Sequence, residues 1–281
     1  MSAASGGVRG GRLPAAGLAV AGLAVAVMAS GATAEPRPLV AAHRGGALLW
    51  PENSLTAFRG ALGLGVDLLE LDVHLTRDGE VVVIHDPTLE RTTAGHGAVA
   101  DHTWAELATV RLRSAAGDGI PRLREVLELV RPTAVRLQVE IKGRVNRTRY
   151  LGIEEKVLAL LRETGLLERA TVMAFEWETL ERLRALDPGV RLTGLLSRRG
   201  AELLGGVRVA VERLAAIRAN DLGIERTALS PEAVAAARAG GLGIGVWTVN
   251  DPEELRRALA AGVDYVTTDR PDLALQLRGR P

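Results

Sequence analysis

The sequence predicts an α/β protein, a TIM (β/α)8 barrel in which a closed parallel sheet is surrounded by helices. Three observations predict it. Short β-rich runs alternate with amphipathic helical patterns, as in successive βα units. Residues 35–281 approach the ~250 residues typical of one such barrel. No linker, repeat or low-complexity tract divides them.

Nine runs have strand character, and one of them must lie outside the barrel. The second and third are joined only by a short segment with the turn Arg77-Asp78-Gly79, whereas parallel neighbours need a crossover of about a dozen residues. We therefore expect an antiparallel hairpin arm at residues 74–84, above the carboxyl end of the second strand. The nine runs are residues 38–43, 66–73, 80–85, 135–141, 170–174, 190–195, 220–225, 243–248 and 263–267.

Helical patterns fit between the strands, and several begin with Pro or a residue that commonly caps helices. Asn53 is expected to cap the first of them. Residues 88–120 contain four glycines and predict a small inserted loop region over the rim. The clearest helical patterns are residues 53–63, 147–164, 176–186, 231–239 and 252–261.

The composition excludes several classes of protein. The chain is 47% hydrophobic and 25% charged, which suits a soluble folded domain and excludes a fibrous or disordered one. It has no cysteine, which excludes a disulfide framework, a thiolate metal site and a lipoprotein anchor. Any metal must therefore be bound by oxygen or imidazole.

Residues 1–34 have the pattern of a secretion signal peptide. Two arginines precede an apolar stretch at residues 13–29, and the small residues 32–34 form a cleavage site. The apolar stretch is shorter than the ~20 residues that span a membrane. We expect cleavage near Ala34 and export to the periplasm, the cell surface or the medium. The mature domain, residues 35–281, would have no stable membrane anchor.

The charge balance argues against nucleic acid as a partner. Cleavage would remove Arg9 and Arg12, the only charged residues of the signal, and change the net charge from +1 to −1. The mature protein then has no basic excess with which to neutralise a phosphate backbone.

Carboxylates at two strand ends predict a cation site. Glu70 and Asp72 are two residues apart in an apolar run, so on a strand both point to one face. Glu140 and Lys142 repeat the pattern on another strand. The simpler reading of the first pair is two solvated acids at a strand end, and that of the second is a local salt bridge, but buried acids need a counter-charge. Three carboxylates suit a hard cation, Mg2+ or Ca2+.

Two histidines occupy matching places at the expected barrel mouth. His43 ends the first strand and His85 ends the returning arm of the hairpin. A single histidine at a strand end is often structural, but two on one rim beside a cation site suit general acid–base catalysis. The other three histidines, His74, His96 and His102, lack that placement.

A series of short motifs covers essentially all of residues 35–281. In order they are A-H-R-G-G, P-E-N-S, E-L-D-V, T-R-D-G, V-I-H-D, R-T-T, E-I-K and W-T-V-N. Each is weak alone, but eight in this order resemble the glycerophosphodiester phosphodiesterase family. The segment Thr268-Asp269-Arg270-Pro271 resembles the closing motif of that family, and we expect it to be structural.

The resemblance implies hydrolysis of a glycerophosphodiester to glycerol 3-phosphate and an alcohol. It implies one divalent cation, Mg2+ or Ca2+, bound by Glu70, Asp72 and Glu140. It also implies His43 and His85 as the acid–base pair. Which histidine is the acid stays open, as does attack by water or by the substrate's own 2-hydroxyl.

The resemblance also implies groups that contact substrate. Arg44 and Lys142 would face the phosphate, and Glu52 would bind or orient the groups around it. Trp247 corresponds to an aromatic at the barrel mouth, where it would pack on glycerol or hold a quaternary ammonium. A core tryptophan is an equal alternative.

Two other functions stay open. The same barrel could cleave a lysophospholipid or a sphingolipid at a membrane surface, as a lysophospholipase D or sphingomyelinase does. However, only 3% of residues are aromatic and no basic amphipathic helix is evident. A barrel that only binds a polyol phosphate is the second alternative. It gives no reason for the complete set of two histidines and three acids.

Overall fold

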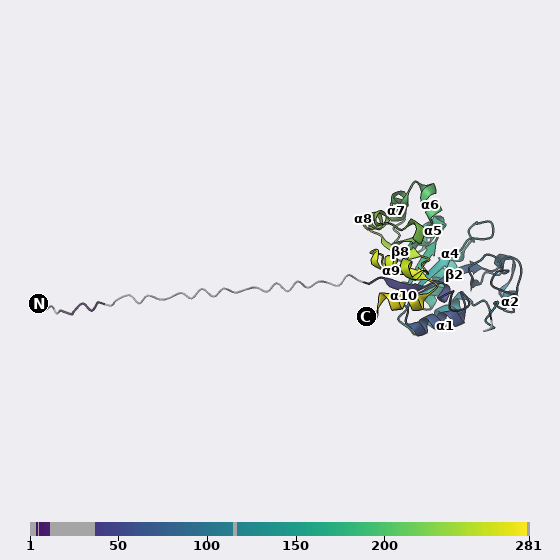
Figure 1. The fold of residues 1–281 in the computed structure, drawn as a ribbon, viewed down its shortest axis with the longest axis horizontal. Helices are drawn as coiled ribbons and strands as arrows, with labels where there is room; N and C mark the ends of the chain where they lie inside the picture. Colours follow the sequence, from purple (N-terminus) through teal and green to yellow (C-terminus); the bar gives the residue numbers. More distant parts are fainter. Residues whose placement is uncertain (1–3, 5, 12–36, 115–116, 280–281) are drawn as a thin grey trace. The chain divides into compact units, whose positions relative to one another are not determined.

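The computed structural model describes residues 4, 6–11, 37–114 and 117–279. Nine strands form one sheet in the order β1-β9-β8-β7-β6-β5-β4-β2-β3, and β1 also pairs with β2. Eight strands therefore close into a barrel (Figure 1). The strands are β1 (Leu39–Ala42), β2 (Leu68–Leu75), β3 (Val81–Val83), β4 (Arg136–Ile141), β5 (Ala170–Ala174), β6 (Arg191–Leu196), β7 (Asp221–Glu225), β8 (Gly243–Trp247) and β9 (Tyr265–Thr268).

The predicted hairpin arm is confirmed. All eight barrel pairings are parallel, whereas β2 and β3 are antiparallel, with Val73 opposite Val83. The amide of Ile84 donates a hydrogen bond to the carbonyl of Asp72. This bond returns the chain to the barrel rim just before His85.

Helices follow the strands around the outside of the barrel (Figure 1). The α-helices are α1 (Leu55–Leu64), α2 (Trp104–Leu107), α3 (Leu123–Val130), α4 (Ile153–Glu163), α5 (Trp177–Leu186), α6 (Arg198–Leu204), α7 (Val207–Ala216), α8 (Pro231–Ala239), α9 (Pro252–Ala260) and α10 (Pro271–Arg278). Short 3-10 turns are η1 (His43–Gly45), η2 (Val99–Asp101), η3 (Leu167–Arg169) and η4 (Arg226–Ala228). None of the described helices combines the length and the apolar character that crossing a membrane requires.

Two of the predicted helix starts are wrong. The cap of α1 is Ser54, whose hydroxyl accepts from the amide of Ala57, while Asn53 has a left-handed backbone (φ 56°). The helix expected from residue 147 begins only at Ile153. Arg147 has φ 59° and Gly152 has φ 81°, conformations that a right-handed helix cannot contain.

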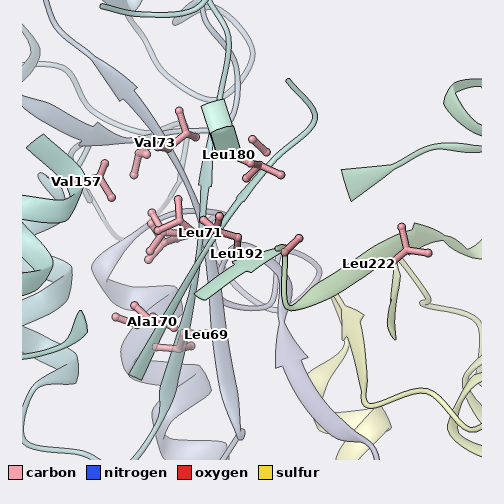
Figure 2. Packing of buried hydrophobic residues seen from close by; sticks show 14 of the residues in the cluster. Leu69, Leu71, Val73, Val157, Ala170, Leu180, Leu192 and Leu222 are labelled. Atoms are coloured by element: carbon pink, nitrogen blue, oxygen red, sulfur yellow. The ribbon is translucent and has the colours of Figure 1, made fainter. Parts of the chain in front are cut away.

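The main core lies between the barrel strands and the surrounding helices. Leu69, Leu71 and Val73 alternate along β2 and pack outward, toward residues such as Val157 of α4 (Figure 2). Because side chains alternate along a strand, Glu70 and Asp72 point to the opposite face. The same alternation that buries the leucines thus sends both carboxylates into the barrel.

The inserted segment after β3 has a small core of its own. Its buried side chains pack with Val82 of β3 and with Ile84, and isolated β-bridges such as Thr88–Ala98 and Thr93–Leu112 tie the segment together. Helix α2 lies within it at the margin of the barrel (Figure 1). The members of this core are Val82, Ile84, Leu89, Val99, Leu107, Leu112 and Ile120. The predicted loop region is therefore an anchored, folded segment over its described residues, 88–114 and 117–120.

Candidate active site

A pocket of about 100 Å³ opens at the carboxyl ends of the barrel strands. Seven of the residues predicted to be functional line it, namely His43, Arg44, Glu70, His85, Glu140, Lys142 and Trp247. The other two predicted residues lie around it: Asp72 is buried beside Lys142, and Glu52 contacts Arg44. The wall is completed by Met173, Phe175, Leu195, Thr248, Tyr265 and Thr267.

The side chains of the three predicted metal ligands lie close together. Glu70, Asp72 and Glu140 are all buried, and each offers a carboxylate oxygen within 4.8 Å of the others. Register explains this, because Asp72 of β2 lies opposite Glu140 of β4. Asp72 Oδ1 is buried without a hydrogen-bond partner among the described residues. An all-oxygen set in which one buried oxygen lacks a hydrogen bond fits a hard divalent cation.

Two basic side chains partly balance this negative charge. Lys142 Nζ lies 2.7 Å from Glu140 Oε1 and 3.5 Å from Asp72 Oδ1, and Arg44 Nε lies 3.4 Å from Asp72 Oδ2. Burial opposes ionisation of Asp72, but Lys142 and Arg44 outweigh it and lower its pKa. Burial and the charge of Asp72 raise the pKa of Glu70 to about 8. Without a cation, the site therefore favours the protonated form of Glu70 at neutral pH.

Asn53 supports the acidic centre directly. Its amide Nδ2 donates to Asp72 Oδ2 at 2.8 Å, and its Oδ1 accepts from the backbone amide of Asp72 at 3.3 Å. The left-handed backbone of Asn53 aims this side chain inward, and Ser54 then caps α1. The expectation that Asn53 is the cap is corrected by these bonds.

His43 is held by a carboxylate from the other end of the chain. Its Nδ1 lies 2.6 Å from Asp269 Oδ1, and its Nε2 lies 4.0 Å from Glu70 Oε2. Asn250 Nδ2 donates to Asp269 Oδ2 at 2.6 Å, and Asn250 Oδ1 accepts from the Asp269 amide. Burial lowers the pKa of His43, but Glu70 and Asp269 raise it above its usual value. Asp269 therefore fixes the orientation of the His43 ring.

His85 has a similar partner close in sequence. Its Nδ1 lies 2.6 Å from Asp86 Oδ1, and the guanidinium of Arg91 donates to both oxygens of Asp86. Burial lowers the pKa of His85, and the charge of Asp72 offsets this only in part. The two predicted acid–base histidines thus have opposite pKa shifts, and each has a carboxylate at Nδ1.

The remaining histidines lie outside the pocket wall, as predicted. His74 is fully buried, with Nδ1 at 2.9 Å from the Tyr150 hydroxyl and Nε2 at 3.0 Å from the carbonyl of His85. Burial lowers the pKa of His74 to about 4, so it is neutral. His96 and His102 lie in the inserted segment, where His102 Nε2 contacts the carbonyl of His96.

Aromatic side chains form one wall of the pocket. The Trp247 indole nitrogen donates to the carbonyl of Gly223 at 2.9 Å, which fixes the ring. Phe175 meets that ring edge-on, with centroids 5.4 Å apart, and Lys142 Nζ lies 6.0 Å from the Phe175 centroid. Trp247 is half-buried at the mouth of the barrel. It packs against Phe175 and also lines the pocket.

Fold and site together define the class as a (β/α)8-barrel enzyme with its polar groups at the carboxyl ends of the strands. Residues 43–273 match the model of the glycerophosphoryl diester phosphodiesterase family. The chain belongs to this family. It is 36% identical to a glycerophosphodiester phosphodiesterase of Caldanaerobacter subterraneus, over 86% of this chain and 98% of the relative.

Solved structures of similar proteins agree with the barrel. One from Agrobacterium tumefaciens, assigned as a glycerophosphoryl diester phosphodiesterase, has a TM-score of 0.82 and 32% identity, covering 86% of this chain and 97% of that one. An Oleispira antarctica phosphodiesterase, solved in complex with the product sn-glycerol-3-phosphate, has a TM-score of 0.73 and 26% identity. That match covers 86% of this chain and 96% of that one.

Proposed function

We propose that this protein hydrolyses glycerophosphodiesters to glycerol 3-phosphate and an alcohol, with a divalent cation at Glu70, Asp72 and Glu140. One observation carries the proposal: the buried acidic centre, the two carboxylate-paired histidines and two basic groups line or border a single pocket. A barrel that only binds a polyol phosphate would not need two acid–base groups beside a cation site.

The three carboxylates would hold the cation, Mg2+ or Ca2+, and Asn53 would keep Asp72 oriented toward it. When bound, the cation would lower the negative charge that a phosphodiester presents to a nucleophile. Arg44 and Lys142, both on the pocket wall, would bind the non-bridging phosphate oxygens. These contacts would strengthen as negative charge grows on the phosphate oxygens during attack at phosphorus.

The histidines would move protons. Asp269 and Asp86 each occupy Nδ1 of one histidine, so Nε2 of each ring is the nitrogen free for transfer. One histidine takes a proton from the nucleophile, and the other gives one to the departing alkoxide, which leaves poorly unless protonated. The aromatic wall of Trp247 and Phe175 would receive an organic part of the substrate.

The test is a substrate panel. Purified protein would be incubated with glycerophosphocholine, glycerophosphoethanolamine, glycerophosphoinositol and bis-glycerol phosphodiester, and glycerol 3-phosphate would be measured with Mg2+, with Ca2+ and with chelator. We expect release with a cation and none with chelator. Head-group release from micellar lysophospholipid or sphingomyelin alone would favour the lipid enzyme. Binding without turnover of any substrate would favour the binding barrel.

We also propose that the protein is exported after cleavage near Ala34. The support is the sequence pattern of residues 1–34, of which the structure describes only residues 4 and 6–11. Mass spectrometry of the protein from the extracytoplasmic fraction should find Glu35 at the N-terminus. Intact protein in the cytosol alone would contradict export.

A further inference from the structure

One arginine of the inserted segment contacts two carboxylates at once. Arg91 Nε and Nη2 donate to Asp86 Oδ2 and Oδ1, at 2.6 and 3.0 Å. Its Nη1 and Nη2 donate to Glu52 Oε2 and Oε1, at 2.8 and 2.7 Å. The planar guanidinium therefore holds each carboxylate through both oxygens, a geometry that lysine cannot reproduce.

Each of those carboxylates contacts a residue of the pocket. Asp86 Oδ1 lies 2.6 Å from His85 Nδ1, and Glu52 Oε1 accepts from Arg44 Nη1 at 3.1 Å. An unbroken series of bonds therefore runs from His85 through Asp86, Arg91 and Glu52 to Arg44. It joins a histidine from the hairpin arm to an arginine that follows β1.

Removal of Arg91 would leave both carboxylates with single partners. Among the described residues, the carboxylate of Asp86 is hydrogen-bonded only to His85 and Arg91, and that of Glu52 only to Arg44 and Arg91. Asp86 would then be free to rotate away from His85. Glu52 would lose the bidentate partner that fixes its carboxylate beside Arg44.

The backbone around Arg91 is well anchored. Leu89 and Thr93, two residues to either side, are buried, and the Thr93 hydroxyl donates to the carbonyl of Leu89 at 2.7 Å. Leu89 belongs to the small core of the inserted segment. The side chain of Arg91 is 47% exposed, yet its guanidinium is held by Asp86 on one side and by Glu52 on the other. An isolated surface ion pair contributes little to stability, but Arg91 binds two carboxylates in bidentate geometry and so belongs to a network.

We propose that Arg91 is a positioning residue, which holds Asp86 against His85 and Glu52 against Arg44 and so keeps the proton-transfer group and the phosphate-binding group in register. The proposal rests on the proposed diester hydrolysis. It gives the inserted segment a role in the reaction in addition to covering the rim.

Steady-state kinetics of Arg91→Met and Arg91→Lys test the role. We expect kcat to fall about 10- to 100-fold through His85 and KM to rise through Arg44, since small misplacements at a reacting centre have effects of this size. Lysine should not restore kcat. The double variant Arg91→Met with Asp86→Asn should be no slower than the slower single variant, because both act through one contact.

Arg77→Met is the matched control. Arg77 also ties the inserted segment to the hairpin, through the carbonyl of Asp101 and the carboxylate of Glu106, and it is similarly exposed. We expect a comparable change in Tm, with kcat and KM within twofold of wild type. Arg91→Met kinetics equal to those of this control, or additive effects with Asp86→Asn, would overturn the positioning role. An inactive wild type would instead refute the hydrolysis on which it rests.

Discussion

His43 Nδ1 lies 2.6 Å from Asp269 Oδ1, although 226 residues separate them in the sequence. Closure of the barrel brings them together. Strand β1 pairs in parallel with β9, with Ala42 opposite Thr268, so the next residue of each strand lies side by side at the rim. Asp269 belongs to the closing motif, which we expected to be structural. In the folded protein it is the partner of His43, one of the two proposed acid–base residues.

We predict that Asp269→Asn lowers kcat about 10²- to 10⁴-fold. An amide can no longer stabilise the imidazolium or hold the tautomer with Nε2 free. Steady-state kinetics, with circular dichroism to confirm folding, measure this. Asp272→Asn is the control, because the Asp272 carboxylate forms an ion pair with Arg270 and does not line the pocket. Equal activity of the two variants would refute the role of Asp269.

Asn53 and Ser54 are adjacent residues with different roles. Substitution of Asn53 should weaken cation binding, whereas substitution of Ser54 should lower stability. Asn53→Gly tolerates the left-handed backbone and removes both bonds to Asp72, so we expect cation affinity to fall about 10-fold or more. Calorimetric titration with Mg2+ or Ca2+ measures it.

Ser54→Ala should instead lower the free energy of unfolding by about 1 kcal/mol, because it removes the cap of α1. Cation affinity should stay unchanged. If Ser54→Ala weakened cation binding as much as Asn53→Gly, the two roles assigned here would be wrong.

The stability of the cation-free protein should depend on pH through Glu70. Burial and Asp72 raise its folded-state pKa to about 8, whereas its ordinary value is 4.5. Between these values the folded protein binds a proton that the unfolded chain has lost, so stability falls as pH rises from about 4.5 to about 8. Glu70→Gln lacks this dependence.

Urea unfolding in chelator at pH 5, 6.5 and 8 measures the effect. The free energy of Glu70→Gln relative to wild type should rise with pH, and Mg2+ or Ca2+ should stabilise the wild type but not the variant. Parallel pH dependences for both proteins would contradict a raised pKa for Glu70.

Phe175 should contribute to substrate affinity. It is 39% exposed, lines the pocket and stands edge-on to Trp247. We expect Phe175→Ala to raise KM for glycerophosphocholine about 3- to 10-fold and to affect bis-glycerol phosphodiester less, because only choline offers a cation to an aromatic face. Leu203→Ala, an exposed residue of α6 outside this pocket wall, should change neither. Equal effects on both substrates would exclude a cation–π contribution.

Periodicity predicted the fold because barrel strands and helices differ in the spacing of their apolar residues. The nine strands and the antiparallel arm follow from alternation and from the short link at Arg77-Asp78-Gly79. The start of α4 was missed because an amphipathic pattern does not reveal a left-handed residue. Arg147 and Gly152 interrupt the helix through backbone angles that residue type alone suggests only weakly.

The pocket residues were predictable where the chemistry is local in sequence. Glu70 and Asp72 share a strand, and His43 and Arg44 follow one directly. Asp269 and Arg91 were missed as supporting residues, since their roles depend on which strand ends and loops become neighbours. Asp269 meets His43 only through the pairing of the first strand with the last.

The most direct test of the central claim compares the wild type with three single variants, His43→Ala, His85→Ala and Glu70→Gln. Each would be assayed for glycerol 3-phosphate release from the best diester of the panel, with saturating Mg2+ or Ca2+. We expect that all three remain folded and that each loses at least about 10²-fold in kcat/KM, with further loss of cation binding only in Glu70→Gln. Activity near that of the wild type in any of the three would contradict the proposed centre.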